Sequence, residues 1–261
     1  MTEPVENGLA SICPNKVTVV LGAQWGDEGK GKIVDLLASE MDLVARCQGG
    51  NNAGHTVVAN GRTYDFHTLP SGIIHLRCTA LIGNGVVLNL PALFDEVKHN
   101  RIDELIGWEK RLKISDQAHL VFDLHMQVDG LQEQARQDNK IGTTKKGIGP
   151  AYSNKARRNG VRVCELMDDF AFFETKYRHL AAYYKNQFGN LDLNVDGEIE
   201  RYKSLAQKLR ELGLVTDSVQ FVQEALNANK KVLVEGANGT LLDIDFGKPF
   251  ITFLQLKIDC L

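Results

Sequence analysis

The chain has 261 residues, 43% hydrophobic and 24% charged, with a formal net charge of −3. These values are ordinary for a globular protein with one large or two modest domains, and they give no electrostatic reason to expect nucleic acid or an anionic membrane as a partner. No apolar run reaches the length of a membrane span, and the five cysteines are scattered without a CxxC pair, which predicts reduced thiols in a cytoplasmic protein rather than disulfides or a zinc site.

A strand, a glycine loop and a helix begin the predicted fold, after a polar stretch (residues 1–15) that we expect to be a flexible extension. The β-branched run Val17–Leu21 predicts a buried strand. Residues 32–39 have apolar side chains at helical spacing, namely Ile33, Leu36 and Leu37. Between strand and helix lie four glycines: Gly22, Gly26, Gly29 and Gly31. Such a loop presents backbone N–H groups and a helix N-terminus to an anion.

The loop differs from the standard P-loop, because Gly31 stands where a Ser or Thr would bind Mg²⁺. We expect Asp27 to replace that hydroxyl as a metal ligand, or to take a proton. Lys30 and Lys32 add positive charge. The pattern predicts a variant phosphate-binding loop, and the alternative is a glycine-rich turn without a ligand.

A second polar corner follows the next predicted strand, residues 42–47. It reads Gln48-Gly-Gly-Asn-Asn-Ala-Gly-His-Thr56 and leads into a predicted hairpin over residues 56–66. We expect His55 to meet Asp27 at one edge of a parallel sheet. An imidazole can donate a proton to an oxygen that gains negative charge, so His55 is the second candidate reactive group. We expect the remaining histidines to be structural: His67, His75, His99, His119, His125 and His179.

Strands and helices alternate in the first 115 residues, which predicts an α/β core with a mainly parallel central sheet. Strands are expected at residues 79–82 and 86–89, with Gly83-Asn-Gly85 between them. Pro91 begins a predicted helix that runs towards Asn100.

Helical periodicity dominates between about residues 116 and 216, with helices predicted at 118–138, 168–188 and 198–212. Between the first two, Ile141–Tyr152 and Lys155–Arg158 are either a solvated basic loop or a phosphate-binding arm. Strand character returns at residues 231–237. We predict five parts: an N-terminal extension (1–15), an α/β nucleotide-binding core (16–115), a helical subdomain with a phosphate-binding loop (116–216), a return to the core sheet (217–247) and a divergent tail (248–261).

Four separated motifs resemble those of the adenylosuccinate synthetases, in the family's order. They are Gln24-Trp-Gly-Asp-Glu-Gly-Lys-Gly-Lys32, Gln48-Gly-Gly-Asn-Asn-Ala-Gly-His-Thr56, Gly147-Ile-Gly-Pro-Ala-Tyr152 and Val234-Glu-Gly-Ala-Asn-Gly-Thr-Leu-Leu-Asp-Ile-Asp245. The resemblance covers about residues 16–247 and implies a cytoplasmic, homodimeric ligase of purine nucleotide biosynthesis. Such an enzyme uses GTP and Mg²⁺ to join L-aspartate to inosine monophosphate (IMP), giving adenylosuccinate, GDP and phosphate.

The resemblance also implies residue roles. Asp27 would take the N1 proton of IMP, so that the 6-oxygen attacks the γ-phosphorus of GTP, and the amine of aspartate would then displace phosphate. His55 would stabilise charge on the transferred group, and Asp27 with the Gly54 carbonyl would hold Mg²⁺. The implied GTP contacts are Gly26, Asp27, Glu28, Gly29, Lys30, Gly31, Lys32, Gly54, His55 and Thr56. The implied IMP contacts are Asp27, Glu28, Gly29, Lys30, Asn52, Ala53, Gly54, His55, Thr144, Asn238, Thr252 and, reaching across a dimer to the partner's nucleotide, Arg158.

Residues 248–261 depart from the family pattern, and Thr252 matches a phosphate-binding threonine only across a one-residue gap. We therefore expect nearly complete phosphate and metal contacts, but loss of aspartate binding and guanine selection. Two other hypotheses stay open at this point. One is a nucleotide-dependent switch or kinase on a variant P-loop. The other is a truncated form that folds, binds IMP or dimerises, and does not turn over.

Overall fold

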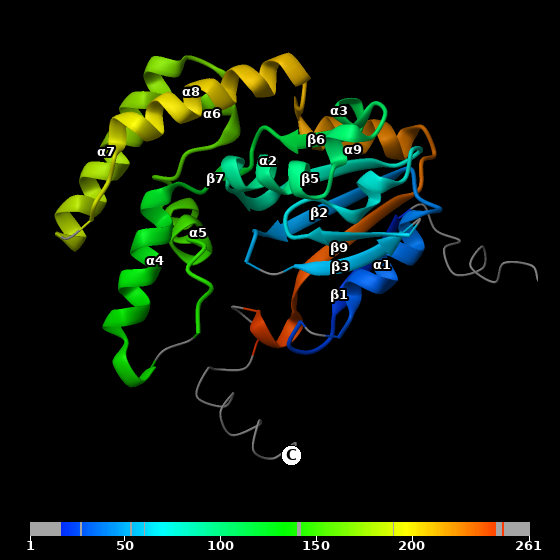
Figure 1. Cartoon of the computed structure of the whole chain (residues 1–261), viewed down its shortest axis with the longest axis horizontal. Helices are drawn as coiled ribbons and strands as arrows, with labels where there is room; N and C mark the ends of the chain where they lie inside the picture. The colour runs from blue at the N-terminus through cyan, green and yellow to red at the C-terminus, as the bar shows by residue number, and fades with distance from the viewer. Residues whose placement is uncertain are drawn as a thin grey trace, which may run out of the picture.

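The computed structural model describes residues 17–26, 28–52, 54–59, 61–139, 142–189, 191–243 and 247. A sheet with the strand order β1-β9-β2-β5-β6-β8 forms its centre, and β7 pairs with the last residues of β5 (Figure 1). All pairings between these strands are parallel, which confirms the predicted α/β class with a mainly parallel sheet. The strands are β1 (Val17–Gly22), β2 (Leu43–Gly49), β5 (Thr79–Leu88), β6 (Leu112–Ser115), β7 (His119–Leu120), β8 (Val215–Thr216) and β9 (Val232–Gly239).

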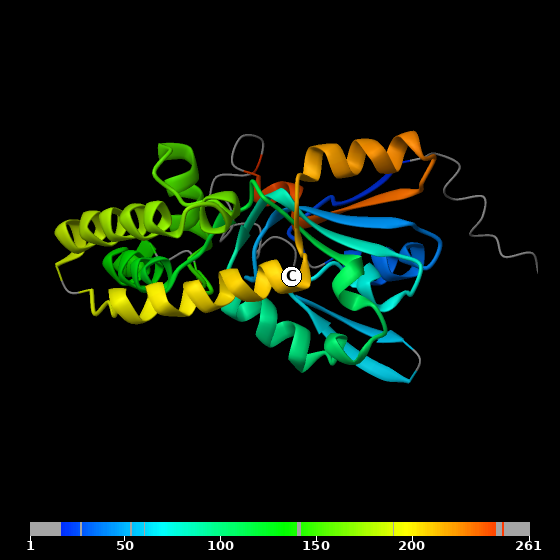
Figure 2. The ribbon, with the colours of Figure 1, turned by 90° about the horizontal axis from the view of Figure 1, so that it is seen from above.

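Helices cover both faces of the sheet, as Figure 2 shows. Helices α1 and α2 and the antiparallel hairpin of β3 and β4 lie on one face, and α9 lies on the other. Successive residues of a strand point to opposite faces, so Val44 packs with α1 whereas Leu43 and Ala45 pack with α9. The bounds are β3 (His55–Ala59), β4 (Arg62–Phe66), α1 (Lys30–Ala38), α2 (Leu90–His99), α3 (Trp108–Arg111), α4 (Asp123–Ala135), α5 (Ile148–Arg157), α6 (Val163–Met167), α7 (Phe170–Phe188), α8 (Val195–Leu212) and α9 (Ser218–Asn227).

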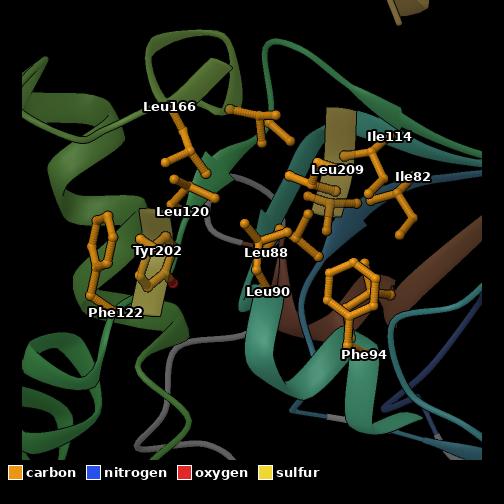
Figure 3. Close-up of a cluster of buried hydrophobic side chains, with 14 of the residues drawn as sticks. Ile82, Leu88, Leu90, Phe94, Ile114, Leu120, Phe122, Leu166, Tyr202 and Leu209 are labelled. Carbon is orange, nitrogen blue, oxygen red and sulfur yellow. The ribbon is translucent and has the colours of Figure 1, made fainter. Parts of the chain in front are cut away.

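Helices α4 to α8 gather at one end of the sheet (Figure 1). Helices α4, α6, α7 and α8 share the main apolar core with the sheet (Figure 3), and α5 packs on it through the smaller cluster of Val87, Val121 and Ala151. One cluster of buried apolar side chains runs from Ile82 and Ile114 in the sheet to Phe122 and Tyr202 among the helices. The ring centroids of Phe122 and Tyr202 are 4.8 Å apart. Strands β7 and β8, inside the predicted helical segment, join the sheet. The division into five parts stays a prediction, and its terminal parts, 1–15 and 248–261, lie outside the described residues.

The predictions for the first strand and helix were partly wrong. Strand β1 is not buried. Among the described residues it forms the edge of the sheet and pairs only with β9, and Val19 and Leu21 are 54% and 63% exposed. Helix α1 begins at Lys30, two residues earlier than predicted, and it buries Val34 and Leu37 rather than Ile33 and Leu36. Apolar residues surround this helix on more than one side, so only contact with the sheet decides which stripe is buried.

Two further segments differ from prediction. Strand β5 continues through Gly83 and Gly85, because these glycines let β2 approach closely: a Cβ on Gly85 would lie 2.1 Å from the Cys47 carbonyl oxygen. The polar segment 141–152 is not a loop throughout, since helix α5 begins at Ile148. Helix α4 begins later than predicted because residues 119–120 form β7.

Candidate nucleotide-phosphate site

The loops that follow β1, β9 and β2 meet at the carboxyl edge of the sheet, because these three strands are parallel neighbours. Glycines allow the close approach. A Cβ on Gly239 would lie 2.1 Å from the Gln24 carbonyl oxygen, and one on Gly49 would lie 2.7 Å from the Ala237 Cβ. The Leu241 N–H also donates to the Gln24 carbonyl, at 3.0 Å. The end of β9 therefore connects the two glycine-rich loops predicted from sequence, which we call the first corner (residues 22–31) and the second corner (residues 48–56).

The first corner ends in helix α1. Gly29 is the N-cap with φ of 83°, no side chain among the described residues caps the helix, and its first turn contains no acidic residue. The Glu28 carboxylate accepts the Gln24 N–H at 2.6 Å and the Lys30 ammonium at 3.0 Å. Its own backbone N–H, Lys30 and the Gln24 N–H lower the pKa of Glu28 to about 2. A carboxylate thus occupies donors that a phosphate-binding loop would offer to phosphate oxygens.

His55 begins β3 and packs directly on α1. A Cβ on Gly31 would lie 2.3 Å from the His55 Cδ2 atom, so only glycine fits beneath this ring. Burial and the nearby Arg46 charge lower the pKa of His55 to about 4, which leaves the ring neutral at neutral pH. Its Nε2 atom is buried and has no hydrogen-bond partner among the described residues. A neutral imidazole with a free ring nitrogen can donate a hydrogen bond to a ligand oxygen.

A pocket of about 240 Å³ lies between the two corners. The structure brings together six predicted residues as its lining: Gly26, Gly29, Lys30, Gly31, Gly54 and His55. Lys32 and Thr56 are exposed and do not line it. Asp27, Ala53 and Thr252 lie outside the described residues.

The other predicted contacts lie outside this pocket. Asn52 and Thr144 line a second pocket of about 430 Å³, and Asn238 is exposed in β9 next to Ala237, which lines the first pocket. Arg158 is exposed at the end of α5 and lines a separate surface pocket.

The third motif is tied to the same edge of the sheet by Tyr152 of α5. Its hydroxyl accepts the Gly49 N–H at 2.9 Å and donates to the Gly85 carbonyl. A Cβ on Gly50 would lie 2.4 Å from the Ile148 Cδ1 atom, so α5 also packs against the second corner. The predicted phosphate-binding arm therefore reaches the sheet edge through this helix.

Two charged residues of the pocket were not predicted. Arg46 in β2 and Glu235 in β9 line the pocket, and both are 4% exposed. The sequence does contain a signal for them, because each is a single charge near the carboxyl end of an apolar strand.

A parallel sheet with helices on both faces, and a glycine loop that enters a helix at its carboxyl edge, define an α/β fold of the nucleotide-binding kind. The family model of adenylosuccinate synthetase matches residues 19–257. The chain therefore belongs to the adenylosuccinate synthetase family. Family membership therefore replaces the hypothesis of a nucleotide-dependent switch or kinase. No helix in the described ranges is long and apolar enough to cross a membrane.

Individual relatives agree with the family match. The chain is 61% identical to the adenylosuccinate synthetase of Caenorhabditis elegans over 240 residues and 55% identical to that of Drosophila willistoni over 257 residues. These matches cover 90% and 98% of this chain, but only 52% and 57% of the relatives. The chain thus spans about half the length of the curated relatives it matches. Its structure is similar to the fully ligated adenylosuccinate synthetase from Plasmodium falciparum, with a TM-score of 0.83 and 38% identity, over 90% of this chain and 55% of that chain.

Proposed function

We propose that this chain takes part in the GTP-dependent ligation of L-aspartate to IMP, the activity that its family resemblance implies. The observation that carries the proposal is the contact of the His55 ring with Gly31. It joins two motifs that are separate in sequence into the lining of one pocket. Phosphoryl transfer depends mainly on positioning and charge neutralisation, which N–H groups, a lysine and an imidazole can supply there.

In the proposed reaction, Asp27 takes the N1 proton of IMP and the 6-oxygen attacks the γ-phosphorus of GTP, which releases GDP. The amine of aspartate then attacks C6, and phosphate leaves with the 6-oxygen. The N–H groups at the start of α1 and the Lys30 ammonium bind phosphate oxygens. His55 donates a hydrogen bond from its free ring nitrogen to an oxygen that gains charge.

We infer that the site takes Mg²⁺, the ion that the family resemblance implies. Among the described residues, no three His, Cys, Asp or Glu side chains are grouped as metal ligands. Mg²⁺ takes one or two carboxylates together with phosphate oxygens. Asp27 and the backbone carbonyl of Gly54, which lines the pocket, would hold the ion. When bound, it neutralises charge on the phosphate groups.

We propose that Arg158 acts in the site of a second copy of this chain. It is exposed, it follows α5 with a left-handed φ of 62°, and its pocket is separate from that of His55. An arginine in this setting is free to bind an anion presented by another molecule. We also place the reaction in the cytoplasm, on the evidence of the scattered cysteines, of which Cys47, Cys78 and Cys164 are unpaired.

A turnover assay tests the proposal. The purified chain is mixed with IMP, GTP, Mg²⁺ and aspartate, and adenylosuccinate formation is followed for wild type, Asp27→Ala and His55→Ala. We expect wild type to bind IMP and GTP, and we expect any turnover by wild type to fall at least about 10²-fold in each variant. Calorimetry with IMP and with GTP separates a chain that binds without turnover from one that is inert. Absence of both turnover and binding would contradict the proposal.

A further inference from the structure

We propose that Arg46 and Glu235 form a positioning pair, in which Glu235 holds the Arg46 guanidinium and Arg46 fixes the backbone corner that leads to Gly54 and His55. This pair belongs to the site of the proposed function. The proposal depends on that function in one test only, which uses Mg²⁺·GTP as the ligand. Neither residue is assigned a contact by the family resemblance.

The pair lies at the floor of the pocket. Arg46 and Glu235 are register partners on the adjacent strands β2 and β9, and both are 4% exposed. The Arg46 Nη1 atom is 3.6 Å from the Glu235 Oε1 atom. The Arg46 Nη2 atom donates to the Gly50 carbonyl at 3.1 Å. The Arg46 guanidinium therefore contacts both the Glu235 carboxylate on the neighbouring strand and the Gly50 carbonyl just beyond the end of β2.

The pair is poorly suited to a purely stabilising role. A buried ion pair offsets the loss of hydration only when its remaining hydrogen-bonding atoms are also satisfied. Within the described chain, the Arg46 Nε atom and both Glu235 carboxylate oxygens lack a well-formed hydrogen bond. Burial raises the pKa of Glu235, against the opposing influence of Arg46 and the Ser71 backbone N–H. Replacement of such a pair by apolar residues of similar size is often neutral or stabilising, so the charges indicate another use.

Arg46 acts on the direction of the chain. The hydrogen bond from Arg46 to the Gly50 carbonyl closes a turn at Gly49, which has φ of 85°. At this turn the backbone leaves strand β2. On the other side of the corner, a Cβ on Gly50 would collide with Ile148 of α5. The corner is thus held between the guanidinium and a helix. Four residues later the same chain segment presents Gly54 to the pocket, followed by His55.

The apolar double variant Arg46→Met/Glu235→Met separates positioning from stability. We expect its thermal midpoint to be no lower than that of wild type, because no buried charge is left unpaired. We expect amide hydrogen exchange over residues 50–56 to be at least tenfold faster and the Kd for Mg²⁺·GTP to rise at least tenfold. Exchange in β9 should not change. Arg77→Met is the control, since Arg77 pairs with Asp42 at the amino ends of β5 and β2, away from the pocket. It should change neither readout.

Wild-type exchange over residues 50–56 in a stable double variant would overturn the proposal. Hydrogen exchange is measured without a ligand, so it tests the positioning role even if wild type binds no nucleotide. Failure of wild type to bind nucleotide would count against the proposed function and not against the positioning role. Arg46→Lys covers the case in which the double variant does not fold. A lysine cannot contact Glu235 and the Gly50 carbonyl with the same fork geometry. We expect faster exchange over residues 50–56 in this variant too, and unchanged exchange would again overturn the proposal.

Discussion

At the scale of single residues, the two corners meet because glycines leave space for neighbouring side chains. Gly31 lies beneath the His55 ring, and Gly54 lies beneath the His67 ring, where an added Cβ would come within 2.5 Å of the His67 Cε1 atom. Gly31 is inside helix α1, where alanine would otherwise be favoured. Its cost to the helix is therefore explained by contact with His55.

A double-mutant cycle on Gly31 and His55 tests this contact. We expect Gly31→Ala to lower the free energy of unfolding by about 1–3 kcal/mol, because the added methyl overlaps the ring. In a His55→Ala background the same change should be neutral or raise that free energy by up to about 1 kcal/mol. Urea unfolding of the four proteins gives the coupling. Gly130→Ala is the control, since Gly130 is inside α4 with no atom within 4 Å of its Cβ position. Additive effects of Gly31→Ala and His55→Ala would show that the two residues do not touch.

Glu28 competes with phosphate for the loop's donors, so its neutralisation should strengthen anion binding. We expect Glu28→Gln to lower the Kd for Mg²⁺·GTP by about three- to tenfold, because it weakens the hold on Lys30 and on the Gln24 N–H. Glu40→Gln makes the same charge change at an exposed residue just beyond the other end of α1. Calorimetry compares the two variants. An equal gain in both would indicate a general charge effect, and weaker binding by Glu28→Gln would indicate that Glu28 assists the ligand.

At the scale of elements, α2 anchors the segment that leads out of the β3–β4 hairpin. The buried Glu96 carboxylate accepts the backbone N–H groups of His67, Thr68 and Leu69 at 2.7, 2.9 and 3.0 Å. Asn100, one turn further along, exchanges hydrogen bonds with the backbone of Asp65. The hairpin that carries His55 is thus fixed to the sheet through this helix.

Removal of the Glu96 side chain should destabilise the protein strongly. We expect Glu96→Ala to lower the free energy of unfolding by about 3–5 kcal/mol, because three largely buried N–H groups lose a charged acceptor. Asp95→Ala removes the exposed carboxylate next to it and should change the value by less than about 0.5 kcal/mol. Denaturant titrations measure both. A loss below about 1 kcal/mol for Glu96→Ala would contradict the anchoring role.

The start of α4 makes stability depend on pH. His125 is fully buried, its Nδ1 atom accepts the Phe122 N–H at 2.9 Å, and burial lowers its pKa from 6.5 to about 3. The unfolded chain therefore takes up this proton first as the pH falls. The stability that His125 contributes is complete above about pH 6.5 and is lost as the pH falls towards 3, by up to about 1.4 kcal/mol per pH unit. His125→Gln should show a shallower loss between pH 6.5 and 4.5 in urea unfolding. Equal slopes in the two proteins would contradict this assignment.

At the scale of the whole molecule, local patterns predicted those features that local chemistry determines. The glycine loop between Gly22 and Gly31, the parallel sheet and the hairpin after His55 each follow from turn residues and hydrophobic periodicity. Burial of β1 and the buried side of α1 were predicted wrongly, because they depend on which neighbours a strand or helix meets. Arg46 and Glu235 were missed for the same reason, since their partnership arises only when β9 inserts between β1 and β2.

The central claim is that the two glycine corners form a single binding site for a nucleotide's phosphate groups. Calorimetric titration of Mg²⁺·GTP into wild type, Lys30→Met and His55→Ala tests it most directly, because each variant changes one corner only. We predict one site per chain in wild type and affinity at least tenfold weaker in both variants. Binding that keeps its wild-type affinity in either variant would contradict a shared site.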